Sequence, residues 1–127
     1  MIIVTCAIIE NDGRILVTQR SEKMSLPLKW EFPGGKIEQG ETAESCLLRE
    51  ILEELNIQIN IMQSLQPNTH VYPDGKKIHL LPFVCKYISG ELILAEHADY
   101  KWLKKEELLS LDWAEADIPI VQAYINK

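Results

Sequence analysis

Two apolar runs at the start of the chain constrain the fold more than any other feature. Residues 2–10 and 14–20 are rich in β-branched side chains, and the tripeptide Asn11-Asp12-Gly13 separates them. Asn, Asp and Gly readily adopt the backbone conformations of tight hairpin turns. The pattern therefore predicts a β-hairpin, and with it a sheet around which the rest of the chain must pack.

The remaining segments alternate between strand-like and helical patterns. A second turn at 73–75 predicts another hairpin, and Pro33-Gly34-Gly35 is expected to interrupt regular structure. Further strands are expected at 30–32, 57–65, 68–73, 76–88, 90–94 and 99–103, and helices at 42–55, 104–111 and 117–125. This order indicates an α+β fold with a mixed or antiparallel sheet, in one domain covering residues 1–127.

Composition excludes several classes of protein. The formal net charge of −6 argues against binding of duplex nucleic acid, and a small polyanionic ligand would need a local source of positive charge. The apolar start is too short to cross a bilayer and lacks a basic region before it. The widely spaced Cys6, Cys46 and Cys85 are expected to be buried, reduced thiols. We therefore expect a cytoplasmic monomer or homodimer without a membrane partner.

The helix expected at 42–55 has two contrasting faces. Its apolar side chains are predicted to face the core, and they are Leu47, Leu48, Ile51, Leu52 and Leu55. Glu50, Glu53 and Glu54 project from roughly the opposite side, because they are spaced by three and four residues. Asn56 follows the last apolar position, and Asn tolerates the left-handed conformation that often ends a helix.

The clustered glutamates are unfavourable for stability on their own. Like charges at this spacing repel, and the helix dipole disfavours negative charge near the C-terminus. Arg49 offsets part of the repulsion, since it can reach Glu53 one turn away. The carboxylates are either a solvated surface face or a site for a hard cation such as Mg²⁺ or Mn²⁺, which prefers oxygen ligands.

The spacing of residues before and within this helix favours the cation site. Gly35 precedes Glu41, which is followed by the run Arg49-Glu50-Ile51-Leu52-Glu53-Glu54 and then by Ile57. This arrangement resembles the Nudix box, with Asn56 standing where the family usually has Gly. The resemblance implies a Nudix fold, an α/β/α sandwich around a mixed sheet, in which the box forms a loop-helix-loop catalytic motif.

The resemblance extends along nearly the whole chain to the MutT-like branch, which hydrolyses nucleoside triphosphates to the monophosphate and pyrophosphate. It implies that Glu50, Glu53 and Glu54 bind Mg²⁺ or Mn²⁺ together with a carbonyl of Gly34 or Gly35, and that Arg49 orients the glutamates. Glu96 matches a carboxylate that MutT-like enzymes supply from outside the box, as a metal ligand or general base; otherwise it is a surface residue. Which carboxylate accepts the proton from water stays open.

Several residues are candidates for contact with the nucleotide. Arg20 and Lys36 are expected to contact phosphate unless they are merely solvated, and Phe32 is expected to contact the substrate. Asp117 lies in a segment that meets the base in MutT-like enzymes. An ionised Asp only accepts hydrogen bonds, which favours the amino group of cytosine over the O6 atom of 8-oxoguanine. Alternatively, Asp117 only caps the helix that follows it.

Other features are interpreted as structural or left open. The histidines at 70, 79 and 97 are expected to be ordinary polar positions. Trp102 is expected in the core, whereas Trp30 and Trp113 could pack there or stack on a base. The function expected is therefore hydrolysis of cytosine or modified-base triphosphates, as in nucleotide-pool sanitation, with 8-oxo-dGTP hydrolysis as the alternative. A nucleotide-binding Nudix module without catalysis is disfavoured, because all the box carboxylates are present.

Overall fold

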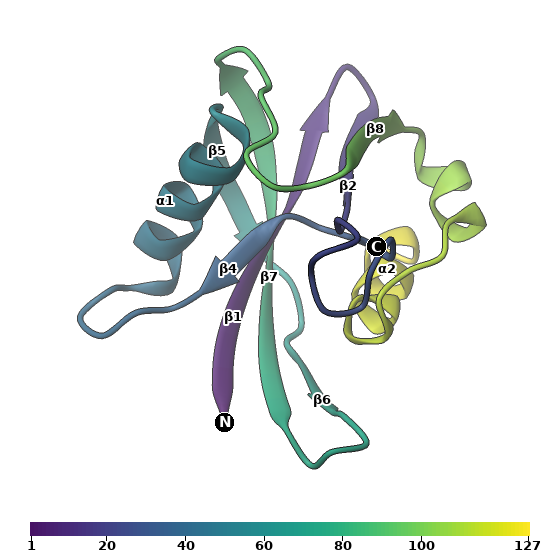
Figure 1. Cartoon of the computed structure of the whole chain (residues 1–127). Coiled ribbons are helices and arrows are strands. Elements are labelled where there is room, and N and C mark those ends of the chain that lie inside the picture. The colour runs from purple at the N-terminus through teal and green to yellow at the C-terminus, as the bar shows by residue number, and fades with distance from the viewer.

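A mixed β-sheet with helices on both faces forms the molecule (Figure 1), and the computed structural model describes all residues from 1 to 127. The strands are β1 (Ile2–Asn11), β2 (Arg14–Gln19), β3 (Trp30–Glu31), β4 (Gly34–Lys36), β5 (Gln58–Ser64), β6 (Asn68–Val71), β7 (Lys77–Ser89) and β8 (Asp99–Leu103). The helices are α1 (Ala43–Leu55), the 3₁₀ helices η1 (Lys105–Ser110) and η2 (Glu115–Asp117), and α2 (Ile118–Ile125). The predicted α+β fold with a mixed sheet is observed.

The sheet is built around β1, which pairs on both sides. Its central path runs β3-β2-β1-β7-β5, while β4 pairs with β1, β6 with β7, and β8 with β2. The pairing of β1 with β7 is parallel and the other strand pairings are antiparallel. Both predicted hairpins form, β1–β2 through Asp12-Gly13 and β6–β7 through the turn at 72–76.

Both faces of the central strands are buried, and this explains their continuous apolar sequences. In β1, Cys6 and Ile8 pack into a core with η1 and α2, whereas Ala7 and Ile9 pack into a second core under α1. Successive side chains of a strand point to opposite faces, so a single strand contributes to both cores. Figure 1 shows α1 on one side of the sheet and α2 on the other.

Three sequence predictions are wrong in detail. Residues 34–36 form β4, because their glycines lie flat against the backbone of β1. The expected strand at 90–94 does not form, although Ile93 and Ala95 donate backbone hydrogen bonds to carbonyls at the end of α1. Leu48 and Leu52 are 44% and 51% exposed, because the sheet covers only the narrower stripe of Leu47, Ile51 and Leu55.

The three cysteines are free and buried, as predicted. Neither α-helix has the length and the apolar content that a membrane span would require.

Candidate active site

The Gly34-Gly35 pair brings the backbone of β4 against two neighbours at very short range. Gly34 lies opposite Cys6 of β1, and a Cβ atom on Gly34 would lie 2.0 Å from the carbonyl oxygen of Thr5. A Cβ atom on Gly35 would lie 2.2 Å from Cδ of Glu50. The contact at Gly34 is with backbone and leaves room only for glycine, whereas at Gly35 any larger residue would displace the side chain of Glu50, so the backbone at Gly35 borders a carboxylate of α1.

Helix α1 begins and ends as its sequence predicts. Thr42 is its N-cap, and its hydroxyl accepts a hydrogen bond from the backbone N–H of Ser45 at 3.1 Å. Asn56 ends the helix with φ of 60°, in the left-handed region. Its side chain also donates to the carbonyl oxygen of Glu91 at 3.1 Å. These two caps define where the helix begins and ends, and therefore the position of its glutamates along the helix axis.

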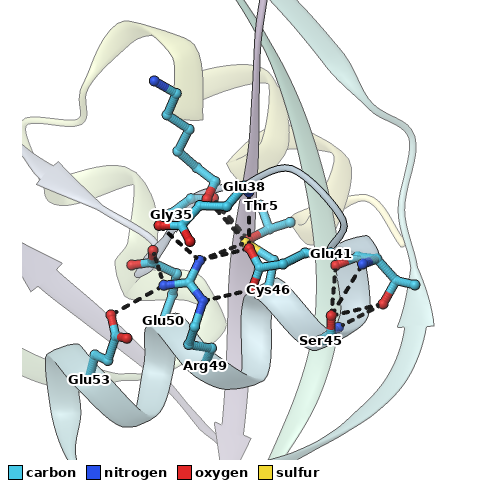
Figure 2. Close-up of polar contacts among 11 residues, drawn as sticks. Thr5, Gly35, Glu38, Glu41, Ser45, Cys46, Arg49, Glu50 and Glu53 are labelled. Atoms are coloured by element: carbon cyan, nitrogen blue, oxygen red, sulfur yellow. Dashed lines mark hydrogen bonds and ion pairs between the residues drawn. The ribbon is translucent and has the colours of Figure 1, made fainter.

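Arg49 lies at the centre of the acidic side chains of this motif (Figure 2). It binds Glu41 through two hydrogen bonds, from Nε at 2.6 Å and from Nη2 at 2.8 Å. Its Nη1 atom donates to Glu50 at 3.0 Å and to Glu53 at 3.2 Å. The hydrogen bonds from Arg49 are the main reason that the pKa of Glu41 falls to about 2. The predicted contact with Glu53 is confirmed, and with Glu38 at 3.9 Å as well, Arg49 acts as the local counter-ion of four carboxylates.

The carboxylates predicted to bind metal lie around one cavity of about 430 Å³. Glu50, Glu53 and Glu54 come from α1, and Glu96 comes from the segment before β8. Gly35 also lines the cavity, directly beside Glu50. The structure therefore brings together the whole predicted set, although Glu96 is far from the others in sequence.

The state of Glu54 indicates that this end of the cavity is suited to a cation. Its Oε1 atom is buried and makes no hydrogen bond. Burial, followed by the charges of Glu31 and Glu50, raises the pKa of Glu54 to about 8. A buried carboxylate with an unpartnered oxygen costs free energy that a bound cation would offset.

The donor set fits Mg²⁺ or Mn²⁺, since it consists of carboxylate and carbonyl oxygens. As the side chains stand, no three His, Cys, Asp or Glu residues are grouped so that they could hold a metal ion. Glu50 and Glu53 are instead bonded to Arg49. Their carboxylates would have to leave Arg49, at least in part, to bind an ion.

Asp117 also lines this cavity, as does Phe32, and the charges that act on the carboxyl group of Asp117 are those of Glu31 and Arg20. Its Oδ2 atom accepts a hydrogen bond from the backbone N–H of Phe32 at 2.9 Å. The side chain makes no capping hydrogen bond to α2, so the interpretation of Asp117 as a helix cap is wrong. Phe32 is itself buried and packs against Trp113, with ring centroids 4.9 Å apart.

Burial raises the pKa of Asp117 to about 8, and the nearby charge of Glu31 adds to this effect. The carboxyl group is therefore mostly protonated at neutral pH, contrary to the ionised state assumed from the sequence. A protonated carboxyl both donates and accepts hydrogen bonds.

The two basic candidates differ in position. Arg20 lines the cavity, but three of its N–H groups are engaged: with the carbonyl oxygen of Ser25 at 2.6 Å, the Ser25 hydroxyl at 3.0 Å and Glu31 at 2.9 Å. Two of the five guanidinium N–H donors are left for a ligand. Lys36 is exposed and does not line the cavity.

The tryptophans belong to the cores. Trp30 and Trp113 are buried beside α2, and Trp102 packs against the core under α1. None of the three lines the cavity.

Sequence reasoning missed Glu31, Tyr72 and His97, which line the cavity. His97 was expected to be an ordinary polar position, yet it is buried and its Nε2 atom lies 3.0 Å from Glu31. Glu31 belongs to the predicted strand beside the Nudix box, and its charge within an otherwise apolar run was the available signal. Tyr72 lies beside a hairpin turn, where no local pattern marks it.

Comparison with known proteins agrees with this geometry. The chain is 37% identical over 125 residues to the CTP pyrophosphohydrolase of Escherichia coli strain K12, covering 98% of this chain and 92% of that protein. It is 34% identical over 122 residues to the nucleoside triphosphatase NudI of an Escherichia coli O17:K52:H18 strain, covering 86% of each.

Its structure matches a solution structure of the Nudix hydrolase MutT from methicillin-resistant Staphylococcus aureus 252. The TM-score is 0.79 and the identity 43%, with 98% of this chain and 95% of that chain covered. Residues 1–124 match the family model described as the NUDIX domain. With the box residues gathered around one cavity and a match along nearly the whole chain, this protein belongs to the Nudix hydrolase family and is MutT-like.

Proposed function

We propose that this protein hydrolyses nucleoside triphosphates to the monophosphate and pyrophosphate, and that cytosine nucleotides are its preferred substrates. The observation that carries the proposal is that one cavity is lined both by Glu50, Glu53, Glu54 and Glu96 and by Asp117 and Phe32. The triphosphate of a nucleotide would bind among the carboxylates, with the base beside Asp117.

The acidic residues would hold Mg²⁺ or Mn²⁺ together with the carbonyl of Gly35. When bound, the ion polarises the phosphate and offsets its negative charge. Before an ion binds, Arg49 holds Glu50 and Glu53 through the hydrogen bonds described above and keeps both carboxylates beside the site. The free N–H groups of Arg20 would contact phosphate oxygens, while Lys36, which lies outside the cavity, would contribute only from its rim.

In the reaction, a water molecule adds to the α- or β-phosphorus, and the bond from that phosphorus to the oxygen between the two phosphates breaks. The products are the monophosphate and pyrophosphate. The proton from water goes to a carboxylate at the same end of the cavity. Glu53 and Glu96 are suited to this role, because both line the cavity and are exposed to solvent.

Two observations favour cytosine. One relative is a CTP pyrophosphohydrolase, at 37% identity. In addition, a protonated Asp117 can accept from the N4 amino group of cytosine and donate to its N3 atom. The same protonated group could donate to the O6 atom of 8-oxoguanine, so 8-oxo-dGTP is the second candidate substrate, with nucleotide-pool sanitation as its setting.

The test compares kcat/KM for CTP, dCTP, 5-methyl-dCTP, UTP and 8-oxo-dGTP, with phosphorus NMR to identify the products. We expect the cytosine nucleotides to rank first, and pyrophosphate to be released. Chelation should abolish turnover, and added Mg²⁺ or Mn²⁺ should restore it. A preference for 8-oxo-dGTP would overturn the cytosine assignment, and full activity after complete metal removal would overturn the mechanism.

If the protein binds these nucleotides but hydrolyses none, it is a binding module rather than an enzyme acting on them. The cytoplasmic location and the monomeric or dimeric state stay predictions; cell fractionation and sedimentation would check them.

A further inference from the structure

Glu31 is held between two positively polarised groups at the wall of the cavity. Its Oε1 atom accepts from Nη1 of Arg20 at 2.9 Å, and its Oε2 atom lies 3.0 Å from Nε2 of His97. Its side chain is 18% exposed, and that of His97 only 3%. A carboxylate bonded through both oxygens has one fixed orientation, and each oxygen keeps a lone pair for a further donor.

The three residues come from neighbouring parts of the sheet. Glu31 lies in β3 and Arg20 directly follows β2, while His97 lies just before β8. β3 and β8 both pair with β2, with Glu31 and Tyr100 each opposite Thr18. The backbone N–H of Ala98 also donates to the carbonyl oxygen of Gln19 at 2.9 Å. The sheet itself therefore fixes the separation of Glu31 and His97.

Glu31 connects the two parts of the cavity. Its bonded partner His97 directly follows Glu96, which belongs to the proposed metal-binding end. Phe32, which directly follows Glu31 in the chain, donates its backbone N–H to Asp117 at the proposed base end. In any nucleotide the sugar joins the base to the phosphates, so a group between these ends faces the sugar.

We propose that Glu31 recognises the sugar of the nucleotide by accepting a hydrogen bond from one of its hydroxyl groups, and that His97 is the positioning residue that holds Glu31 for this contact. This inference rests on the proposed function and deepens it. A second feature supports the role of His97. Its buried Nδ1 atom has no hydrogen-bond partner, which lowers the stability of the folded protein, and the only polar contact of the ring is that of Nε2 with Glu31.

The test compares kcat/KM for CTP, dCTP, 3′-deoxy-CTP and 2′,3′-dideoxy-CTP. A hydrogen bond from a neutral donor to a charged acceptor corresponds to a preference of about 10- to 100-fold for the nucleotide that carries the recognised hydroxyl. Glu31→Ala should bring this ratio toward one, by raising KM for the hydroxyl-bearing nucleotide more than for the dideoxynucleotide. The control is Glu115→Ala, which removes an exposed carboxylate that does not line the cavity.

Two His97 variants separate positioning from packing. His97→Gln keeps an N–H donor near the position of Nε2, whereas His97→Phe keeps a ring of similar shape without a donor. We expect His97→Phe to reduce the sugar ratio and His97→Gln to retain most of it, at equal thermal stability. If His97→Phe does not fold, the Glu31 variant decides the question alone.

Equal losses for nucleotides with and without the hydroxyl would overturn the inference, because Glu31 would then act on the metal, the base or the reaction itself. If another base proves to be preferred, the same sugar series is run with that base. If no triphosphate is hydrolysed, the proposed function fails, and calorimetric titration of the same nucleotides with Mg²⁺ still measures the sugar ratio.

Discussion

The two ends of the cavity are built in different ways. At the proposed metal-binding end, Glu50, Glu53 and Glu54 come from a single stretch of α1 and owe their common direction to the helical repeat, and only Glu96 is added from a distant segment. At the proposed base end, Phe32, Tyr72 and Asp117 come from three segments that only the folded sheet brings together. The proposed roles therefore predict that mutations at the first end change the rate of the reaction and that mutations at the second change the choice of substrate.

The largest effect is expected at the metal-binding end. Glu53→Gln removes a charge from an exposed side chain and should lower kcat on the order of 100-fold or more, the size typical of losing one electrostatic stabiliser. Unfolding free energy without metal should change by less than about 0.5 kcal/mol, since the residue is exposed. Steady-state kinetics and urea unfolding measure the two quantities.

Glu44→Gln is the matched control, because Glu44 lies exposed in the first turn of the same helix and does not line the cavity. It should leave kcat unchanged. Near wild-type turnover in Glu53→Gln, or unfolding of that variant, would show that the acidic face has another role.

At the base end, Asp117→Asn should change the ranking of substrates rather than the chemistry. An amide resembles a protonated carboxyl in offering a donor and an acceptor, but it cannot ionise. Above pH 8, where the wild-type group is charged, we expect the preference of the variant for cytosine over 8-oxoguanine to differ from that of the wild type by about 10-fold. At about pH 6 the two proteins should differ by less. An unchanged ranking at both pH values would show that Asp117 does not meet the base.

The stability of the metal-free protein should depend on pH through two kinds of carboxyl group, those whose pKa is raised and one whose pKa is lowered on folding. Glu54 and Asp117 have pKa values of about 8 in the folded protein, against ordinary values of 4.5 and 3.8. The folded state thus binds these protons more tightly than the unfolded chain, so the metal-free unfolding free energy should fall as pH rises from about 4 to about 8. Glu41 acts in the opposite sense: its stabilising contribution is present above about pH 4.5 and is lost as pH falls toward about 2.

Urea unfolding with a chelator at about pH 5 and about pH 8 measures the first of these trends. Asp117→Asn and Glu54→Gln should each flatten the decline, and Mg²⁺ should stabilise the protein more at the higher pH. A metal-free protein that is more stable at the higher pH would contradict the burial of these two carboxyl groups.

The smallest effect concerns the end of α1. Asn56→Gly should cost under about 1 kcal/mol, because Gly adopts the same left-handed conformation but loses the hydrogen bond to Glu91. Asn56→Val should cost more, about 1–3 kcal/mol, since a β-branched residue resists positive φ. Thermal unfolding compares the variants, and equal stability would mean that the conformation at residue 56 does not matter.

What the sequence could predict follows the same division. The hairpins, α1, its end at Asn56 and the acidic face all arise from residues close together in the chain, and they were predicted correctly. Leu48 and Leu52 were misassigned to the core because helical periodicity does not show how wide a stripe the sheet will cover. Strand β4 was missed because Gly usually indicates a turn. Here Gly34 and Gly35 instead allow the strand to lie close to Thr5 and Glu50, which are distant in sequence.

Asp117 became a candidate for base recognition only through family resemblance. Nothing in the local sequence shows that Asp117 would be buried against Phe32, or that burial would protonate it. His97 could not be distinguished from an ordinary polar residue, because its partner Glu31 lies in another strand.

The parallel pairing of β1 with β7 has a consequence for how the chain folds during synthesis. Ile2 pairs with Ile78 and Glu10 with Lys86, so the paired residues of the two strands are far apart in the sequence. Closing such a long loop is entropically costly, and contacts of this kind slow folding. β1 is therefore synthesised well before β7, and the edge of β1 that faces β7 stays unpaired until residues 77–89 have been made.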